Sequence, residues 1–370
     1  MAEVNPPLVV KPVILKNLYR NGNKIPMALR NGELIYQMVT RLVFSVDTNS
    51  LSFDPTGETK TITITANDDW TMTVPEWITA SSLSGYTGAT ISLTAGSTES
   101  GRTGNIVITC GGKSHTVSVD QVLDYSKMYL TIEAQEAGTF TINKAVGYSL
   151  NGGAWATSSA GQELSLQTGD RIRFKFTATG YQLSSLFKNN TLSCKAYGNV
   201  LSLTSGDNYE STTSIIASGL CNSFDYFSGL TDASNLVFPA TSLNQDCYRG
   251  MFNGCANMVT GPKVLPATTL ATRCYRSMFQ DCVKLLRGPD LPATTLVNGC
   301  YYNMFGDAWT LNYVKCLATS ISATDSHTQW MLNVQTTSGT FVKNPNISAS
   351  TWGRGQNGIP NNWTVEDAVL

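Results

Sequence analysis

The chain has few of the residues that enzymes commonly use for acid–base chemistry. Its two histidines are His115 and His327, the second in a polar loop, and neither lies beside a Ser or Cys motif typical of a hydrolytic triad. No Walker loop and no Gly-x-Gly-x-x-Gly phrase occurs. Glycosidases need two carboxylates, and we interpret the acidic run near aromatic residues as solvated loop acids: Asp207, Glu210, Asp225 and Asp232. We expect no enzyme, no catalytic residue and no cofactor.

Charge and long apolar runs are also scarce. Charged residues make up 14% of the chain, against roughly 25% in a typical globular protein, and the net charge is -1. Without a Lys/Arg stripe, no nucleic-acid partner is indicated. No window approaches the ~18 uncharged apolar residues of a membrane helix, so we expect no membrane insertion. Residues 1–7 lack the features of a signal peptide, and we expect no export by the secretory route.

Turn-forming and β-forming residues make up the share of the composition that charged residues occupy in other proteins. With 370 residues the chain is too long for one ordinary core, so about two to four domains are expected. Gly, Thr, Ser and Asn are abundant, as in proteins built from many short strands and tight turns. The composition therefore predicts a fold dominated by β-structure.

Two phrases repeat near the C-terminus. The first occurs at residues 247–252 (CYRGMF), 274–279 (CYRSMF) and 300–305 (CYYNMF). The second occurs at residues 238–243 (FPATSL), 265–270 (LPATTL) and 291–296 (LPATTL), with a degenerate copy at 316–321 (CLATSI). A fixed period in the twenties predicts a solenoid, because each coil buries its apolar side only by stacking on its neighbours.

The repeat predicts columns of equivalent side chains. Phe252, Phe279 and Phe305 are spaced by 27 and 26, and Phe227 lies 25 before the first of them. We expect these phenylalanines to be buried and stacked.

The tyrosines and cysteines of the repeats leave alternatives open. Tyr248, Tyr275 and Tyr301 belong either to the buried ladder, which we favour, or to an exposed stripe that contacts a ligand. The chain has nine cysteines, an odd number. Six of them lie in the repeats, and their one-per-coil spacing favours columns of buried thiols over disulfides. The spacing does not fit zinc, so no metal site is expected.

These phrases resemble BspA-like leucine-rich repeats, whose unit reads LPATTL, a spacer and then CYxxMFxxC. The terminal phrase around Gly339–Lys343, Trp352 and Trp363 is similar to the capping end of such arrays. The resemblance implies a short capped solenoid at residues 217–370, with a long regular surface suited to binding.

Residues 43–123 show the alternating short strands of a β-sandwich, for example at 59–66 (TKTITITA) and 105–109 (NIVIT). The phrases LSF at 51–53, VPEWIT at 74–79 and RTG at 102–104 resemble the BACON domain, a module found beside carbohydrate-active domains. The resemblance implies sugar binding, with Trp77 as a candidate stacking face. The alternation itself favours Trp70 and Trp77 as core residues.

Two further segments complete the organisation. Residues 124–216 read as a second β-sandwich of the immunoglobulin-like type. Residues 1–42 read as a hairpin arm, because Asn21-Gly22 and Asn31-Gly32 are strong signals for type I′ turns within a small antiparallel meander. A meander of three strands is marginal alone, so the arm docks either on another molecule or on the next domain.

The arm phrase NG-x-x-I-Tyr at 31–36 looks like those of phage structural proteins. This resemblance implies a fibre or decoration protein of a crAss-like or related virion, assembled in the host cytoplasm and exposed on the particle. Tyr19, Ile35 and Tyr36 would anchor it to other capsid or tail proteins. Copies of the chain would form a dimer or trimer, and the distal modules would bind a host-surface glycan or protein. The alternatives are a bacterial surface adhesin and, less favoured, a glycan-degrading enzyme.

Overall fold

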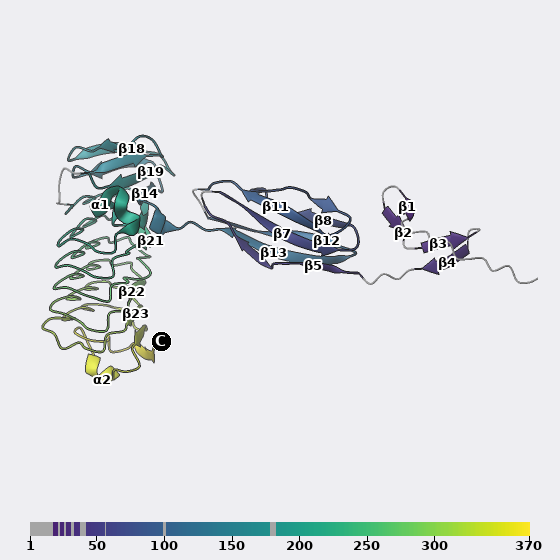
Figure 1. Cartoon of the computed structure of the whole chain (residues 1–370). Helices are drawn as coiled ribbons and strands as arrows, with labels where there is room; N and C mark the ends of the chain where they lie inside the picture. The colour runs from purple at the N-terminus through teal and green to yellow at the C-terminus, as the bar shows by residue number, and fades with distance from the viewer. Residues whose placement is uncertain are drawn as a thin grey trace, which may run out of the picture. The chain divides into compact units, whose positions relative to one another are not determined.

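The computed structural model describes residues 18–20, 23–25, 27–30, 33–37, 42–55, 57–98, 101–177 and 183–370, with side chains from Leu42 onward. The chain divides into two compact units, Met1–Asp124 and Tyr125–Leu370, drawn in Figure 1. This division falls one residue after the predicted end of the BACON-like segment.

The N-terminal arm contains two separate antiparallel strand pairs rather than the three-stranded meander that the sequence predicted. The strands are β1 (Leu18–Arg20), β2 (Asn23–Ile25), β3 (Met27–Arg30) and β4 (Glu33–Gln37). Arg20 pairs with Asn23 and Arg30 with Glu33. The Asn-Gly pairs at 21–22 and 31–32 lie outside the described residues.

The rest of the first unit is two sheets packed on one core. One sheet has the strand order β10-β8-β12-β13-β6 and the other β5-β7-β11-β9. The strands are β5 (Phe44–Val46), β6 (Ser50–Ser52), β7 (Glu58–Ala66), β8 (Trp70–Thr73), β9 (Ile78–Ala80), β10 (Ser84–Gly85), β11 (Ala89–Ala95), β12 (Arg102–Cys110) and β13 (Lys113–Gln121). Alternation explains the packing, because Ile62 and Ile64 of β7 point inward while Thr61, Thr63 and Thr65 face solvent.

The second unit begins with a six-stranded sheet of order β17-β16-β19-β14-β20-β21, beside a two-stranded sheet, β15-β18. The strands are β14 (Leu130–Ala134), β15 (Gly138–Ile142), β16 (Gly147–Leu150), β17 (Ala156–Thr157), β18 (Gln162–Leu166), β19 (Arg171–Lys175), β20 (Cys194–Asn199) and β21 (Leu230–Val237). Short helical turns flank them: η1 (Tyr125–Lys127), α1 (Ser202–Ser205) and η2 (Gly206–Ser211).

The predicted second sandwich at residues 124–216 is not a separate domain. Strand β20 pairs in parallel with β21, which lies beyond the predicted boundary, and one hydrophobic core runs from Leu130 to Trp363. Residues 183–190 already form a coil, since Ser185 N donates to Asn222 O at 2.9 Å and Phe187 N donates to Ser223 O at 2.9 Å in the next coil. We call residues 183–370 the coil stack.

The repeated phrase forms a run of tight turns. Among the described residues, three positions in each of five successive coils have positive φ, four residues apart: 218, 222 and 226; 246, 250 and 254; 273, 277 and 281; 299, 303 and 307; and 325, 329 and 333. Small or polar residues occupy most of them, as left-handed backbone favours. Backbone N–H groups between these positions donate to the next coil, for example Tyr248 N to Cys274 O at 2.9 Å.

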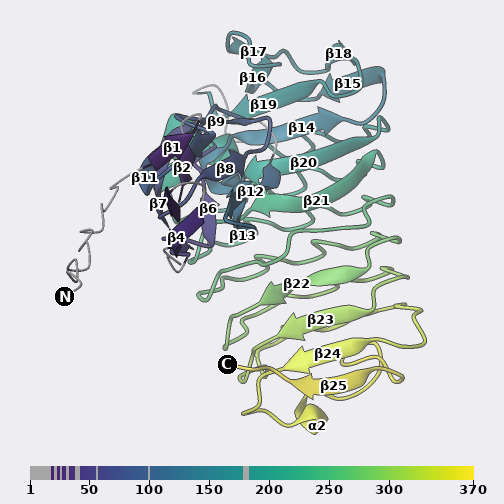
Figure 2. The same ribbon diagram turned by 90° about the vertical axis from the view of Figure 1, so that its right-hand side faces the viewer.

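The other side of the stack is a parallel sheet. Its strands are β22 (Arg287–Leu291), β23 (Tyr313–Cys316), β24 (Thr340–Lys343) and β25 (Thr364–Asp367), paired in that order. Single bridges through Thr260 connect this sheet to β21. Figure 2 shows the strands following one another from β14 to β25.

Helix α2 (Ala349–Trp352) closes the C-terminal end of the stack. Ser348 caps its N-terminus by accepting a hydrogen bond from Ser350 N. Trp352 is 2% exposed and its ring lies 5.2 Å from that of Trp330. The last coil therefore does not leave its apolar side in water.

Candidate functional site

The three repeat tyrosines form a buried column, not an exposed stripe. Tyr248, Tyr275 and Tyr301 are at most 1% exposed. Ring centroids are 5.6 Å apart for the first pair and 6.1 Å for the second, with the rings nearly parallel. The burial confirms the favoured alternative, a buried ladder, and contradicts the other, a stripe that contacts a ligand, because a surface ligand cannot reach rings inside the stack.

The predicted phenylalanine column is confirmed, with one correction. Phe252, Phe279 and Phe305 are fully buried, with centroids 5.5 and 5.6 Å apart. The ring that precedes them is Phe224, 5.2 Å from Phe252, and not Phe227. The spacing of 26 to 27 residues does not hold here, because the step from Phe224 to Phe252 is longer than the two later steps.

Both aromatic columns end on one residue, Trp330. Its ring lies 6.4 Å from Tyr301 and 6.4 Å from Phe305, and Trp352 stacks on it at 5.2 Å. His327 packs edge-on against both tryptophans, at 5.9 and 5.4 Å. His327 is therefore half-buried in the end cap, whereas the sequence placed it in a polar loop.

All nine cysteines are free thiols in the structure, and eight are buried. Burial raises the pKa of the thiols of Cys247 and Cys300 to about 12. Because the thiolate is the reactive form of cysteine, these thiols are packing residues rather than nucleophiles.

In the first unit, Trp77 lies half-buried at an edge of the core. The guanidinium of Arg102 lies over its ring, 4.8 Å from the centroid, and Phe53 meets it edge-on at 6.0 Å. Arg102 is held there because Nε donates to Gln121 Oε1 at 2.7 Å. A sugar that stacks on this face has to displace Arg102, and the role of Trp77 as a ligand contact stays a prediction.

Other residues of the first unit have packing roles. Trp70 is 1% exposed, which confirms it as a core residue, and its indole N–H donates to Thr87 O at 2.8 Å. A Cβ at Gly85 would come within 2.6 Å of the Trp70 ring, so only glycine fits there. A Cβ at Gly104 would lie 2.5 Å from Pro75.

Sequence reasoning missed an aromatic and charged cluster beside the six-stranded sheet. The Trp155 ring follows a turn at 151–153 and lies 4.5 Å from the Lys175 ammonium and 4.9 Å from the Tyr129 ring. Asp207 accepts hydrogen bonds from the Tyr129 hydroxyl at 2.7 Å and from Lys175 at 3.0 Å. The only sequence signal was a tryptophan after a glycine-rich turn.

Within the cluster, the carboxylate of Asp207 is paired with the ammonium of Lys175. Hydrogen bonds from Tyr129 and Lys175 hold the pKa of the Asp207 carboxyl below its ordinary value. Burial, together with Asp207, raises the pKa of the Tyr129 phenol to about 12. Since the charges satisfy one another, the cluster fixes the loop around Trp155 and leaves little to offer a ligand.

Some predicted features fall outside what the structure describes. Tyr19 belongs to β1, and Ile35 and Tyr36 to β4, but their side chains lie outside the described part. Across residues 42–55, 57–98, 101–177 and 183–370, no cluster of three or more metal-ligating side chains occurs. Within the described chain, no helix has the length and hydropathy to cross a membrane.

Residues 37–122 match the protein family described as "BACON: Putative binding domain, N-terminal". This range covers both sheets of the first unit and the phrases built around Trp70 and Trp77. Residues 37–122 are a BACON domain. The match leaves the coil stack unassigned.

Other comparisons add little. A solved structure, the Bacteroides ovatus GH5 xyloglucanase in complex with a XXXG heptasaccharide, shares 22% identity over 24% of this chain, with a TM-score of 0.22. The match covers 20% of that enzyme's chain, about a fifth of its length. No curated protein matches the chain.

Proposed function

We propose that the chain is a structural protein of a phage virion, of the crAss-like or a related type, that binds the host surface. The observation that carries the binding part is the BACON domain at residues 37–122, since its family is described as a binding domain. The virion part rests on the resemblance of the arm to those of phage structural proteins. The protein would be exposed on the particle and would not be an enzyme.

The coil stack supports a role in presenting a surface. Its aromatic columns repeat without interruption from Phe224 to Trp330, and α2 closes the end. We infer that it is a short BspA-like leucine-rich-repeat solenoid. Such arrays form extended regular surfaces, which suit contact with a glycan or a surface protein.

The arm would hold the protein in the particle. Strands β1 to β4 form two short pairs, and pairs of this size gain stability by docking. Residues 1–42 would bind other capsid or tail proteins, with Tyr19, Ile35 and Tyr36 as apolar anchors. A symmetric dimer or trimer would cover strand edges.

The main alternative is a bacterial surface adhesin. A binding domain suits an adhesin as well as it suits a virion protein. Antibodies against residues 125–370 distinguish the two, applied to purified particles and to washed cells of the culture that makes the protein. Label on particles supports the virion protein. Label confined to cell envelopes identifies an adhesin and overturns the proposal.

A second experiment tests the arm. Deleting residues 1–42 should leave the two packed sheets β5 to β13 and the second compact unit folded but abolish incorporation into particles. Incorporation of the deletion variant at full occupancy would contradict the anchor role.

A further inference from the structure

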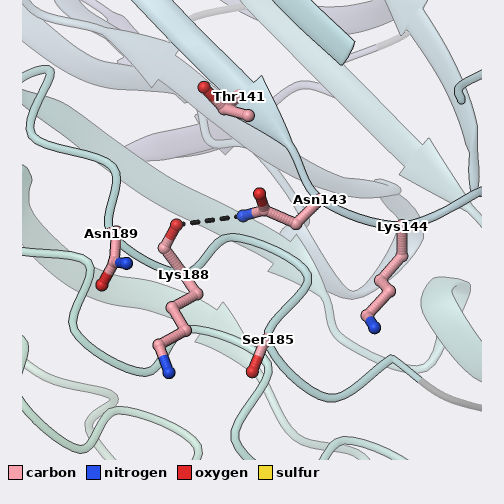
Figure 3. Close-up of a pocket in the computed structure, with 6 residues that line it drawn as sticks. All are labelled: Thr141, Asn143, Lys144, Ser185, Lys188 and Asn189. Carbon is pink, nitrogen blue, oxygen red and sulfur yellow. Dashed lines mark hydrogen bonds between the residues drawn. The ribbon is translucent and has the colours of Figure 1, made fainter. Parts of the chain in front are cut away.

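A hollow lies where strand β15 ends beside the first coil of the stack. Its volume is about 310 Å³. Figure 3 shows the lining residues, with Lys144 and Lys188 on opposite sides of Ser185. The lining residues are Thr141, Asn143, Lys144, Ser185, Lys188 and Asn189. We call this feature the Lys144–Lys188 hollow.

The backbone around the hollow is fixed before any ligand arrives. Asn143 N donates to Leu186 O at 2.9 Å, and Asn143 Nδ2 donates to Lys188 O at 3.0 Å. The buried amide of Asn190 bonds both the N–H and the C=O of Thr141, at 2.8 and 3.0 Å. A preformed site saves the entropy of ordering its walls during binding.

The charge of the hollow is positive. Lys188 lies 3.6 Å from Asp225, a carboxylate that is 6% exposed, so the sequence interpretation of Asp225 as a solvated loop acid is wrong. Within the described residues, Lys144 forms no ion pair. Asp225 pairs with Lys188 alone, so the charge of Lys144 is left for a ligand.

An aromatic side chain, Tyr226, lies next to Lys188, just outside the residues that line the hollow. Tyr226 is 50% exposed, and the Lys188 ammonium lies 5.6 Å from its ring. The repeat tyrosines Tyr248, Tyr275 and Tyr301 are buried, so Tyr226 differs from them in offering its ring to solvent. An exposed ring beside hydroxyl and amide groups suits the flat apolar face of a pyranose.

We propose that the Lys144–Lys188 hollow binds one acidic sugar unit of a polysaccharide, with its anionic group at the lysines and its ring against Tyr226. Thr141, Ser185 and Asn189 would meet the sugar hydroxyls. The volume is near the lower end of the ~300–1,000 Å³ range of small-molecule sites, which suits a single unit or side branch. The inference rests on the proposed host-surface function and names its ligand class.

The test measures binding of the full-length protein to three hexasaccharides by calorimetry: an oligogalacturonate, a sulfated galactan and a neutral galactan. The first two share the anionic pyranose and separate carboxylate from sulfate as its source. We expect at least one acidic sugar to bind about tenfold or more tightly than the neutral one, because hydrogen bonds to charged groups are the stronger kind. Raising the salt concentration should weaken this binding.

Variants locate the site. Lys144→Gln should weaken acidic-sugar binding about tenfold, and Tyr226→Asn should weaken it severalfold, with asparagine tolerating the positive φ of 54°. Lys284→Gln removes the same charge from an exposed lysine elsewhere on the stack and should have no effect. Lys188→Gln is the riskier variant, because it leaves Asp225 without its cation, so its folding is checked by thermal unfolding.

Three results would overturn the inference: Lys144→Gln binding like the wild type, equal binding of neutral and acidic sugars, or displacement of the sugar by equimolar sodium sulfate. None of them bears on the labelling of particles, which tests the proposed function separately. Conversely, label found on cells alone would leave a measured sugar affinity standing.

Discussion

The BACON domain and the coil stack bury their aromatic side chains in opposite ways. In the BACON domain, Trp70 has a place of its own, filling the space left by Gly85 and donating to Thr87 O. In the coil stack, Phe279 lies between two copies of itself, at 5.5 and 5.6 Å. In the sandwich each core residue makes contacts that occur once, whereas in the stack the same contact recurs from coil to coil.

The difference predicts how each region responds to damage. The two hydrophobic cores share no residue. A core substitution in one unit should therefore lower the stability of that unit and leave the other unfolding transition unchanged. Within the stack, a lost ring removes contacts from the coils on both sides.

The largest effect is expected at Trp330, where the two aromatic columns meet. Trp330→Ala should lower the free energy of unfolding of residues 125–370 by about 5 kcal/mol, the upper end for large-to-small changes, because the cavity faces Tyr301, Phe305 and Trp352. Denaturant titration of the full chain measures this loss, provided that the two units unfold in separate transitions.

Trp309→Ala serves as the control, since Trp309 is 46% exposed and the change removes an equal number of atoms. It should change stability by about 0.5 kcal/mol or less. Equal losses in the two variants would mean that Trp330 does not close the columns.

The same contrast explains what the sequence could reveal about the fold. The phenylalanine column was predictable because identical letters recur at nearly constant spacing. The coil at residues 183–190 was not predictable. It has the same left-handed turns as the next coil, and its Phe187 packs on Phe224, but the two coils have almost no other residues in common. The predicted boundary at residue 216 fell inside the stack for this reason.

Sites were harder to predict than packing. The direction of Tyr248 depends on the left-handed turns around it, and repetition alone fits an inward or an outward ring. The Lys144–Lys188 hollow joins residues 45 and 49 positions apart through hydrogen bonds of Asn143 and Asn190, which no local pattern shows. The resemblance made Trp77 a candidate stacking face, but no pattern in the sequence showed that Arg102 covers this ring.

A smaller effect is expected in the BACON domain. Gly85→Ala would bring a Cβ within 2.6 Å of the Trp70 ring and should lower the stability of that unit by about 1–3 kcal/mol through overpacking. Gly96→Ala is the matched control, because a Cβ there meets nothing within 4 Å. The comparison fails if both alanines cost the same, or if Gly85→Ala shifts unfolding of residues 125–370.

The end cap of the stack should weaken in acid. Burial lowers the pKa of the His327 imidazole below its ordinary value, so the folded state binds a proton less readily than the unfolded chain. Stability from this group is present above about pH 6.5 and declines below it, by at most about 1.4 kcal/mol per pH unit, until the folded-state pKa is reached. Unfolding of residues 125–370 at pH 7.5 and 5.5 should show a larger acid loss in the wild type than in His327→Gln. Identical losses would remove His327 as the cause.

The smallest effect tests whether the tyrosine column needs its hydroxyls. The hydroxyls of Tyr248 and Tyr275 are buried without a hydrogen-bond partner, which costs the folded state part of their hydration. Tyr248→Phe and Tyr275→Phe should therefore leave the free energy of unfolding unchanged or raise it by up to about 1 kcal/mol. Tyr209→Phe is the control, because this buried hydroxyl donates to Lys127 O at 2.7 Å, and its removal should cost about 1 kcal/mol. If Tyr275→Phe is as costly as Tyr209→Phe, the hydroxyl has a partner such as a buried water, and the column is held by polar contacts as well as by stacking.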